Sequence, residues 1–253
     1  MKFGGSCLRD LESFHRISEV LKGYSQNELV LVSSALYGVT NSLIDLAKKA
    51  ENHSIDLDKE LNSIADKHTS LVEKVIKNDL KEKSLDEIQR EISELEVALK
   101  DIWDYGLKPQ KLDLVSSFGE RLSTIILQRY LEAEGYKTVY VSSYDVIFTT
   151  NEPQNALPIL ERTEQRIKER IQPLLSEGKI PVVTGFFGRD AQGNVTLLGR
   201  GGSDFTATIL AYCLKNDNDD VKVVLWKDVD GLLTANPKLE PRAHLIREIS
   251  YSE

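Results

Sequence analysis

The feature that most limits the fold of this chain is a regular alternation of short apolar runs with stretches of helical periodicity. The apolar runs are rich in Val, Ile and Leu, which is typical of strands buried on both faces. They lie at residues 29–33, 113–116, 138–141, 180–184 and 221–226. The stretches between them repeat apolar residues at spacings of three and four, as in Leu11, Phe14, Ile17, Leu21 and Leu122, Ile125, Ile126, Tyr130. Strand, loop and helix in repetition predict a layered α/β sheet.

One segment, residues 54–107, interrupts this alternation with two long helical patterns. Their apolar positions are Leu61, Ile64, His68, Leu71, Val75 and Leu85, Ile88, Ile92, Leu95, Leu99, Ile102. These spacings predict a pair of helices inserted into the α/β domain. The pair could cover a cleft or pack as a simple hairpin on the outside, and the pattern does not separate the two. A softer joint is expected at 151–158, where Asn, Pro and Gln cluster.

Composition excludes several classes of protein. With 253 residues the chain fits one large domain, and its net charge of −8 gives no basic field for nucleic acid or anionic lipid. Its two cysteines lack metal or disulfide spacing, which favours a reducing cytoplasm. No apolar stretch approaches a membrane span or a secretory signal, so we expect a protein that is neither anchored nor secreted.

The strongest local motif is GRGGSD at 199–204, which follows a predicted strand at 195–198 and precedes a helix. Its glycines allow close backbone approach, and the helix N-terminus with Arg200 could bind a carboxylate or phosphate. Asp204 would repel a pyrophosphate, so a cationic partner is expected beside it, either an amino group or a metal. The alternative is an ordinary tight turn in which Ser203 caps the helix.

A second glycine loop, residues 4–6, follows Lys2 at the start of the chain. A lysine at a strand end can neutralise charge on a transferring phosphoryl group. The alternative is that Lys2 is a solvated terminal residue. Asp10 is expected to cap the helix that begins at Leu11.

Three more segments place small or charged residues near predicted strand ends. They are SSALYGVTN at 33–41, VSSFGERLS at 115–123 and VVLWKDVDGLLTANPK at 223–238. Thr40 could face a ligand or cap a helix. Glu120 could face the same site or form a capping box with Ser117. Lys227 and Asp228 could lie at the site or belong to a turn rich in Asp and Gly.

The five segments are expected to meet, because ligands of open α/β sheets bind beyond the carboxyl ends of the strands. Three cations, Lys2, Arg200 and Lys227, beside the carboxylates of Glu120 and Asp204 would suit a zwitterionic substrate next to a polyphosphate. None of the four histidines lies in a setting typical of a general base. Phosphoryl transfer to an ionised carboxylate needs none.

In their order and spacing the five segments resemble the aspartokinases, members of the amino acid kinase family. KFGGSC resembles that family's KFGGTS loop, SSALYGVTN its S-A-x-x-x-T-N segment and SSFGERLS its S-x-G-E-x-x-S segment. GRGGSD matches as it stands, and WKDVDGLLTANPK resembles W-T-D-V-D-G-x-x-T-x-D-P-R. The resemblance implies a three-layer αβα sandwich with a mainly parallel central sheet. Residues 1–253 would form the kinase catalytic domain, with 54–107 as a helical insertion.

The resemblance also implies ATP-dependent phosphorylation of the side-chain carboxylate of L-aspartate, with Mg²⁺ accompanying the nucleotide, in a cytoplasmic protein that forms a homodimer. By this resemblance Lys2 and Asp204 would be catalytic. The substrate would be bound by Thr40, Glu120, Arg200, Gly201, Gly202, Ser203 and Asp204. The nucleotide would lie along Lys2, Gly4, Gly5, Ser6, Lys227, Asp228 and Lys238.

The sequence departs from the family pattern mainly on the nucleotide side. Lys227 replaces the usual Thr, Leu233 stands where an aromatic residue often lies against adenine, and Lys238 replaces an Arg. The family's F-G-A-K-V-L-H-P segment and its regulatory ACT domains are missing from this sequence. The resemblance is therefore to a kinase catalytic domain that is either native at this length or excised from a longer protein, such as a bifunctional aspartokinase/homoserine dehydrogenase. Two alternatives follow: a non-catalytic relative that binds aspartate or a nucleotide as a regulatory module, and a kinase for another amino acid such as glutamate.

Overall fold

The computed structural model describes residues 1–250 except 55, 78, 217–219, 230 and 238. In that part of the chain a five-stranded parallel sheet has the order β3-β4-β2-β1-β7. Its strands are β1 (Lys2–Phe3), β2 (Leu31–Ser33), β3 (Thr138–Val141), β4 (Ile180–Thr184) and β7 (Leu225–Trp226). A separate antiparallel pair is formed by β5 (Phe187–Arg189) and β6 (Val195–Leu197).

Helices cover both faces of the sheet, which confirms the three-layer αβα prediction. Alternate residues of one strand point to opposite faces, so Leu31 and Val182 pack in one buried cluster and Val32 and Val183 in the other. The first cluster includes α1 (Leu11–Lys22), α2 (Val39–Glu51) and α5 (Pro109–Ala133). The second includes α7 (Leu160–Arg170), α8 (Gln172–Ser176) and α9 (Gly202–Leu214). Two shorter helices are η1 (Gly5–Leu8) and α6 (Ser143–Val146).

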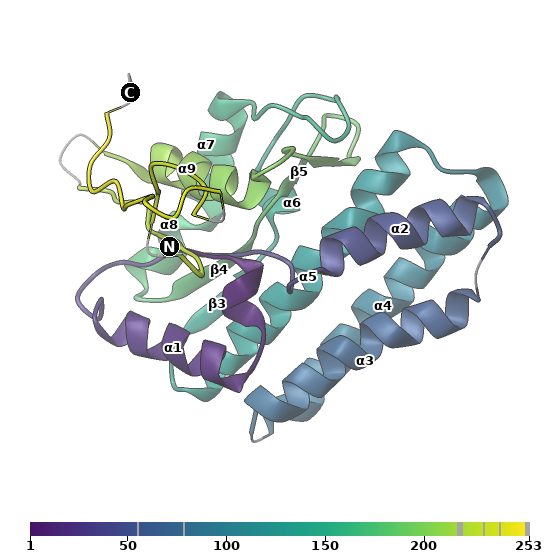
Figure 1. Ribbon diagram of the computed structural model, residues 1–253, viewed down its shortest axis with the longest axis horizontal. Helices are drawn as coiled ribbons and strands as arrows, with labels where there is room; N and C mark the ends of the chain where they lie inside the picture. The colour runs from purple at the N-terminus through teal and green to yellow at the C-terminus, as the bar shows by residue number, and fades with distance from the viewer. Residues whose placement is uncertain (55, 78, 217–219, 230, 238, 251–253) are drawn as a thin grey trace.

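The two helices predicted between 54 and 107 are α3 (Leu57–Val75) and α4 (Leu80–Tyr105). Their predicted apolar stripes are buried and join the same core cluster as α1 and α5, with His68 fully buried among them. Figure 1 shows α2, α3, α4 and α5 gathered side by side on one side of the molecule. The pair therefore packs as a hairpin on α5 and α2, as the second of the two alternatives proposed.

The strand predicted at 113–116 is wrong. These residues lie inside α5, a helix of 25 residues that runs between the sheet and the hairpin. Because α5 is buried on nearly all sides from Asp113 to Leu131, its sequence lacks the polar face that reveals a helix. The informative signal was Pro109, since proline is favoured in the first helical turn. The capping box of Ser117 and Glu120 is wrong for the same reason, because both lie in mid-helix.

Other local predictions were closer. The strands at 138–141 and 180–184 have the predicted bounds, while β2 and β7 are shorter than their apolar runs. Asp10 caps α1 as expected, accepting a hydrogen bond from the Ser13 N–H at 2.9 Å. Among the described residues no helix is long and apolar enough to span a membrane.

Candidate active site

Two adjoining pockets lie where strands β1, β2 and β7 end. The pockets have volumes of about 380 and 190 Å³, and both are lined by Ser34, Thr40 and Glu120. The larger is completed by Gly5, Ser6, Ala35, Leu36, Tyr37, Gly38, Asn41 and Asp228. The smaller is completed by Lys2, Phe186, Gly201, Gly202, Ser203 and Asp204. The expected crevice at the carboxyl edge of the sheet is therefore present, with residues of all five segments around it.

The glycines at the pockets allow the chain to approach itself closely. A Cβ on Gly5 would lie 2.6 Å from the carbonyl oxygen of Ala35, and one on Gly202 would lie 2.8 Å from the ring of Phe186. Gly201 occupies the N-cap position of α9 with a φ of 76°, a conformation that favours glycine. The helix therefore begins at Gly202, and the alternative that Ser203 caps it is wrong.

The charged centre of the site is Asp204, held between two lysines. Lys2 Nζ lies 2.7 Å from Asp204 Oδ1, and Lys227 Nζ lies 2.9 Å from Oδ2. Burial opposes ionisation of Asp204, but the hydrogen bonds from both lysines outweigh it and hold its pKa below the ordinary value. Lys2 is only 7% exposed, so it is not a solvated terminal residue. The three groups join the first strand, α9 and β7 into one electrostatic unit with net positive charge.

Glu120 is the second charged group of the site, and it differs from Asp204 in its environment. Its side chain is 3% exposed, and its Oε2 has no hydrogen-bond partner among the described residues. Burial raises its pKa to about 8, although the Ala35 N–H and the charge of Lys2 favour the ionised form. A buried carboxyl with a free oxygen at a pocket wall is suited to receive a cationic ligand.

Thr40 lies in the wall of both pockets. It is the second residue of α2, whose N-cap position is Gly38, so Thr40 faces the pockets and does not cap the helix. Ser203 is likewise in the wall of the smaller pocket and is 8% exposed. Of the two roles considered for Thr40, the capping role is wrong, and contact with a ligand stays a prediction.

Three of the predicted site residues are less closely placed. Arg200 is exposed and lies outside the residues that line either pocket, although its neighbour Gly201 lines one. Asp228 lines the larger pocket but is exposed. Lys238 lies outside the described residues. The predicted set is thus assembled around Lys2, Glu120 and the start of α9, with Arg200 at the rim.

Comparison with known proteins agrees with this geometry. The whole chain, residues 1–253, matches the family described as "Amino acid kinase family". The chain belongs to the amino acid kinase family. It is 31% identical to aspartokinase 1, chloroplastic, of Arabidopsis thaliana, and 28% identical to an aspartate kinase of Pseudomonas putida. Both alignments cover 100% of this chain and 44% and 47% of the relatives, so the chain spans about half the length of the curated relatives it matches.

Solved structures of amino acid kinases show the same fold. The aspartokinase III of E. coli in complex with aspartate and ADP superposes with a TM-score of 0.84 at 26% identity, covering 97% of this chain and 52% of that one. The aspartate kinase of Clostridium acetobutylicum gives 0.73 at 25% identity, covering 100% of this chain and 52% of that one. The resemblance to aspartokinases inferred from the five segments is therefore confirmed.

The structure adds residues to this amino acid kinase site that the motifs did not single out. Phe186, which precedes β5, lines it, and so does Ser34, which directly follows β2 in the segment at 33–41. Lys67 of α3 donates a hydrogen bond of 2.7 Å to the carbonyl oxygen of Tyr37 at the larger pocket. Phe186 has a φ of 81°, but no sequence pattern announces such a conformation in a non-glycine residue. Lys67 could not be found either, since it depends on how the hairpin packs.

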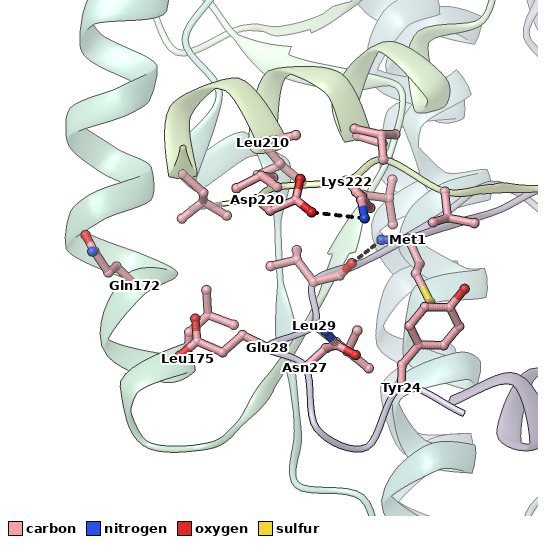
Figure 2. Close-up of a pocket in the computed structure, with 18 of the residues that line it drawn as sticks. Met1, Tyr24, Asn27, Glu28, Leu29, Gln172, Leu175, Leu210, Asp220 and Lys222 are labelled. Atoms are coloured by element: carbon pink, nitrogen blue, oxygen red, sulfur yellow. Dashed lines mark hydrogen bonds and ion pairs between the residues drawn. The ribbon is translucent and has the colours of Figure 1, made fainter. Parts of the chain in front are cut away.

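A third pocket, of about 580 Å³, lies at the opposite edge of the sheet, before strands β1, β2 and β7 (Figure 2). It is larger than the other two, but none of the predicted site residues lines it. Its visible ion pair, Asp220 with Lys222 at 2.9 Å, joins two highly exposed side chains. Volume alone therefore does not identify the site, whereas the buried charges of Lys2 and Glu120 do.

Proposed function

We propose that this amino acid kinase transfers the γ-phosphoryl group of ATP to the side-chain carboxylate of L-aspartate, giving 4-phospho-L-aspartate and ADP. The observation that carries the proposal is the pairing of two unlike carboxyls at one pocket. Asp204 is neutralised by two lysines, while Glu120 keeps a buried oxygen without a partner. The solved complex of the E. coli relative with aspartate and ADP supports this choice of ligands.

The amino acid would occupy the smaller pocket. The α-ammonium group would approach Glu120, whose pKa would then fall as the ligand cation replaces the missing partner. The α-carboxylate would be received by Arg200 and the N–H groups at residues 201–203, where α9 begins. Thr40 and Ser203 would complete the wall. For Arg200 this requires a turn inward from the exposed rim when the substrate binds.

The nucleotide would occupy the larger pocket and the loop of Gly4, Gly5 and Ser6. Lys2 would stabilise charge on the transferring phosphoryl group, and Lys227 and Asp228 would lie along the polyphosphate. Lys238 is assigned here on the resemblance alone. The bond from the γ-phosphorus to the bridging oxygen breaks as the bond to the aspartate carboxylate oxygen forms. No general base is needed, because the attacking carboxylate is already ionised.

Magnesium would enter as part of the ATP complex. In the part of the chain that the structure describes, no group of three His, Cys, Asp or Glu side chains could hold a metal. Mg²⁺ commonly keeps several waters and binds through substrate phosphates with one or two carboxylates. The exposed carboxylate of Asp228 at the larger pocket is suited to be the one protein ligand of a Mg²⁺ ion held mainly by the phosphates.

The proposal is tested by incubating the protein with MgATP and L-aspartate and trapping the acyl phosphate with hydroxylamine. We expect an aspartate-dependent hydroxamate and one ADP per product. Folded protein that forms no product with aspartate would favour a non-catalytic binding module. Faster product formation with glutamate would favour a kinase for that amino acid. A homodimer and a cytoplasmic location stay predictions, and the Arabidopsis relative is named chloroplastic.

A further inference from the structure

One fully buried carboxylate, that of Asp113, lies outside the two pockets. Asp113 lies in the first turns of α5 and is 0% exposed. A buried carboxylate without a cationic partner is costly, so such a group is retained where its hydrogen bonds do something that an apolar residue cannot. Burial raises the pKa of Asp113 to about 6, against the opposing effect of two backbone N–H donors.

Both of these donors bond to the same oxygen of Asp113. The N–H groups of Gln154 and Leu197 each lie 2.9 Å from Oδ2, while Oδ1 has no partner among the described residues. Gln154 and Leu197 are far from Asp113 in sequence and belong to different segments. One carboxylate oxygen of the long helix therefore holds two separate pieces of chain together.

These two pieces support the loop at 199–204 directly. Leu197 ends β6, two residues before Gly199, and its carbonyl oxygen accepts the N–H of Ala156 at 2.9 Å. A Cβ on Gly199 would lie 3.3 Å from the carbonyl oxygen of Gln154 and 3.2 Å from Asn155 Oδ1. The segment at Gln154 and Asn155, which Asp113 holds, therefore lies against Gly199, the residue before Arg200.

The backbone at Gln154 shows why an acceptor is needed. Its φ of 65° lies in the left-handed region, which costs free energy for a residue other than glycine. Gln154 is exposed and its segment has few buried side chains to hold it. The hydrogen bond from its N–H to Asp113 offsets part of this cost.

We propose that Asp113 is a positioning residue for the substrate side of the active site, acting through Gln154 and Leu197 to hold the loop at 199–204. It touches neither pocket, so it acts on substrate binding only through the placement of Arg200, Gly201 and Ser203. The part that concerns the amino acid substrate rests on the proposed function. The part that concerns the loop does not.

The chemistry of the contact provides a conservative variant. Because a single oxygen accepts both hydrogen bonds and the other has no partner, the amide oxygen of Asn can replace Oδ2 in Asp113→Asn. Asp113→Ala removes this acceptor and leaves two N–H groups without partners. Val115→Ala, on the same helix, is the matched control. Val115 is also 0% exposed, and its truncation costs stability through a cavity without removing a hydrogen bond to Gln154 or Leu197.

The experiment combines steady-state kinetics with hydrogen exchange of peptides covering residues 195–204. For Asp113→Ala we expect exchange there to rise about tenfold and the aspartate KM to rise at least about fivefold, with the ATP KM within about twofold. Asp113→Asn should stay within about twofold of the original protein in all three measurements. Val115→Ala should lower the denaturation midpoint and leave the exchange at 195–204 and both KM values unchanged. If Asp113→Ala does not fold, Asp113→Ser, whose hydroxyl is too short to reach both donors, takes its place.

Unchanged exchange at 195–204 in Asp113→Ala would overturn the proposal, and so would an equal rise of the aspartate KM in Val115→Ala. A rise in Asp113→Asn as large as in Asp113→Ala would also overturn it, because the hydrogen bonds would then not be what matters. If the original protein phosphorylates no aspartate, the proposed function fails, but the exchange measurement still decides whether Asp113 holds the loop.

Discussion

Two consecutive residues of α5, Glu120 and Arg121, face two different regions, the pockets and the α3–α4 hairpin. The two regions differ in how their buried charged groups are paired. Arg121 faces the hairpin, where its Nε lies 2.6 Å from Glu91 Oε2 and a further nitrogen bonds to Glu94. Glu120 faces the pockets, where one of its oxygens has no partner among the described residues. Charges that hold the hairpin are paired within the protein, whereas the charge at the site is left available. What distinguishes Glu120 is an unpartnered carboxyl oxygen at the wall of a pocket.

The same contrast extends along the helix pair. Arg129 lies about two and a half turns beyond Glu120 on α5. Its side chain is 13% exposed and bonds to Glu87 and Glu132. On the site side, Lys2 is comparably buried but shares Asp204 with Lys227, so two cations compete for one carboxylate. At the hairpin four carboxylates surround the two arginines, whereas the site carries excess positive charge that a polyphosphate would neutralise.

The largest effect is expected from Lys2→Ala. If Lys2 stabilises the transferring phosphoryl group, its removal should lower kcat by about 10²–10³-fold in the hydroxamate assay. Stability should change little, because Asp204 keeps Lys227 as a partner. Lys222→Ala is the matched control, since Lys222 is a highly exposed lysine that pairs with Asp220. A kcat for Lys2→Ala within about threefold of the original would show that Lys2 is structural, like the hairpin cations.

The second effect concerns Glu120→Gln, which keeps the shape of the side chain and removes its charge. The aspartate KM should rise about tenfold or more while the ATP KM stays within about twofold. Glu132→Gln on the same helix is the control, because its carboxylate faces Arg129. Equal rises of both KM values in Glu120→Gln would contradict the assignment of Glu120 to the amino acid.

The raised pKa of Glu120 gives the site a pH dependence. Its folded-state pKa of about 8 lies above the unfolded value of 4.5, so the folded protein binds the proton more tightly. Stability of the ligand-free protein should be fully supported below about pH 4.5 by this group and should fall as the pH rises toward 8. Glu120→Gln should flatten that fall in denaturation curves measured at pH 5, 6.5 and 8. Asp113 contributes in the same direction over a lower range, because its pKa is raised to about 6.

The position of the site at one edge of the sheet could be predicted from the sequence, but the helix α5 and its contribution to the site could not. The glycine loops and strand ends predicted which edge of the sheet carries the site, because turn chemistry is local. Glu120 was assigned to the site for a partly wrong reason, since the expected strand before it is a helix. A helix buried on all sides loses the periodicity that sequence reasoning depends on. The roles of Asp113 and Lys67 depend on contacts between distant segments, which no local pattern contains.

The third effect should fall on stability alone. Arg121→Ala leaves Glu91 half-enclosed without its cation, and burial already raises the pKa of that carboxyl. We expect a loss of about 2 kcal/mol in the free energy of unfolding, measured in urea, with both KM values unchanged. The double variant Arg121→Met with Glu91→Gln should recover part of the loss, because the only carboxylate left without its arginine, Glu94, is exposed. A change of aspartate KM in Arg121→Ala would show that the hairpin and the site are not separate.

The smallest effect is expected where the two regions touch. Lys67 of α3 donates its hydrogen bond to the carbonyl oxygen of Tyr37, in the loop that lines the larger pocket. The contact is exposed, so Lys67→Ala should cost at most about 0.5 kcal/mol and raise the ATP KM by less than about twofold. Lys59→Ala, an exposed lysine on the same helix, is the control. A larger rise of the ATP KM in Lys67→Ala alone would mean that the hairpin positions the nucleotide side of the site. Helices α3 and α4 would then contribute to nucleotide binding as well as to stability.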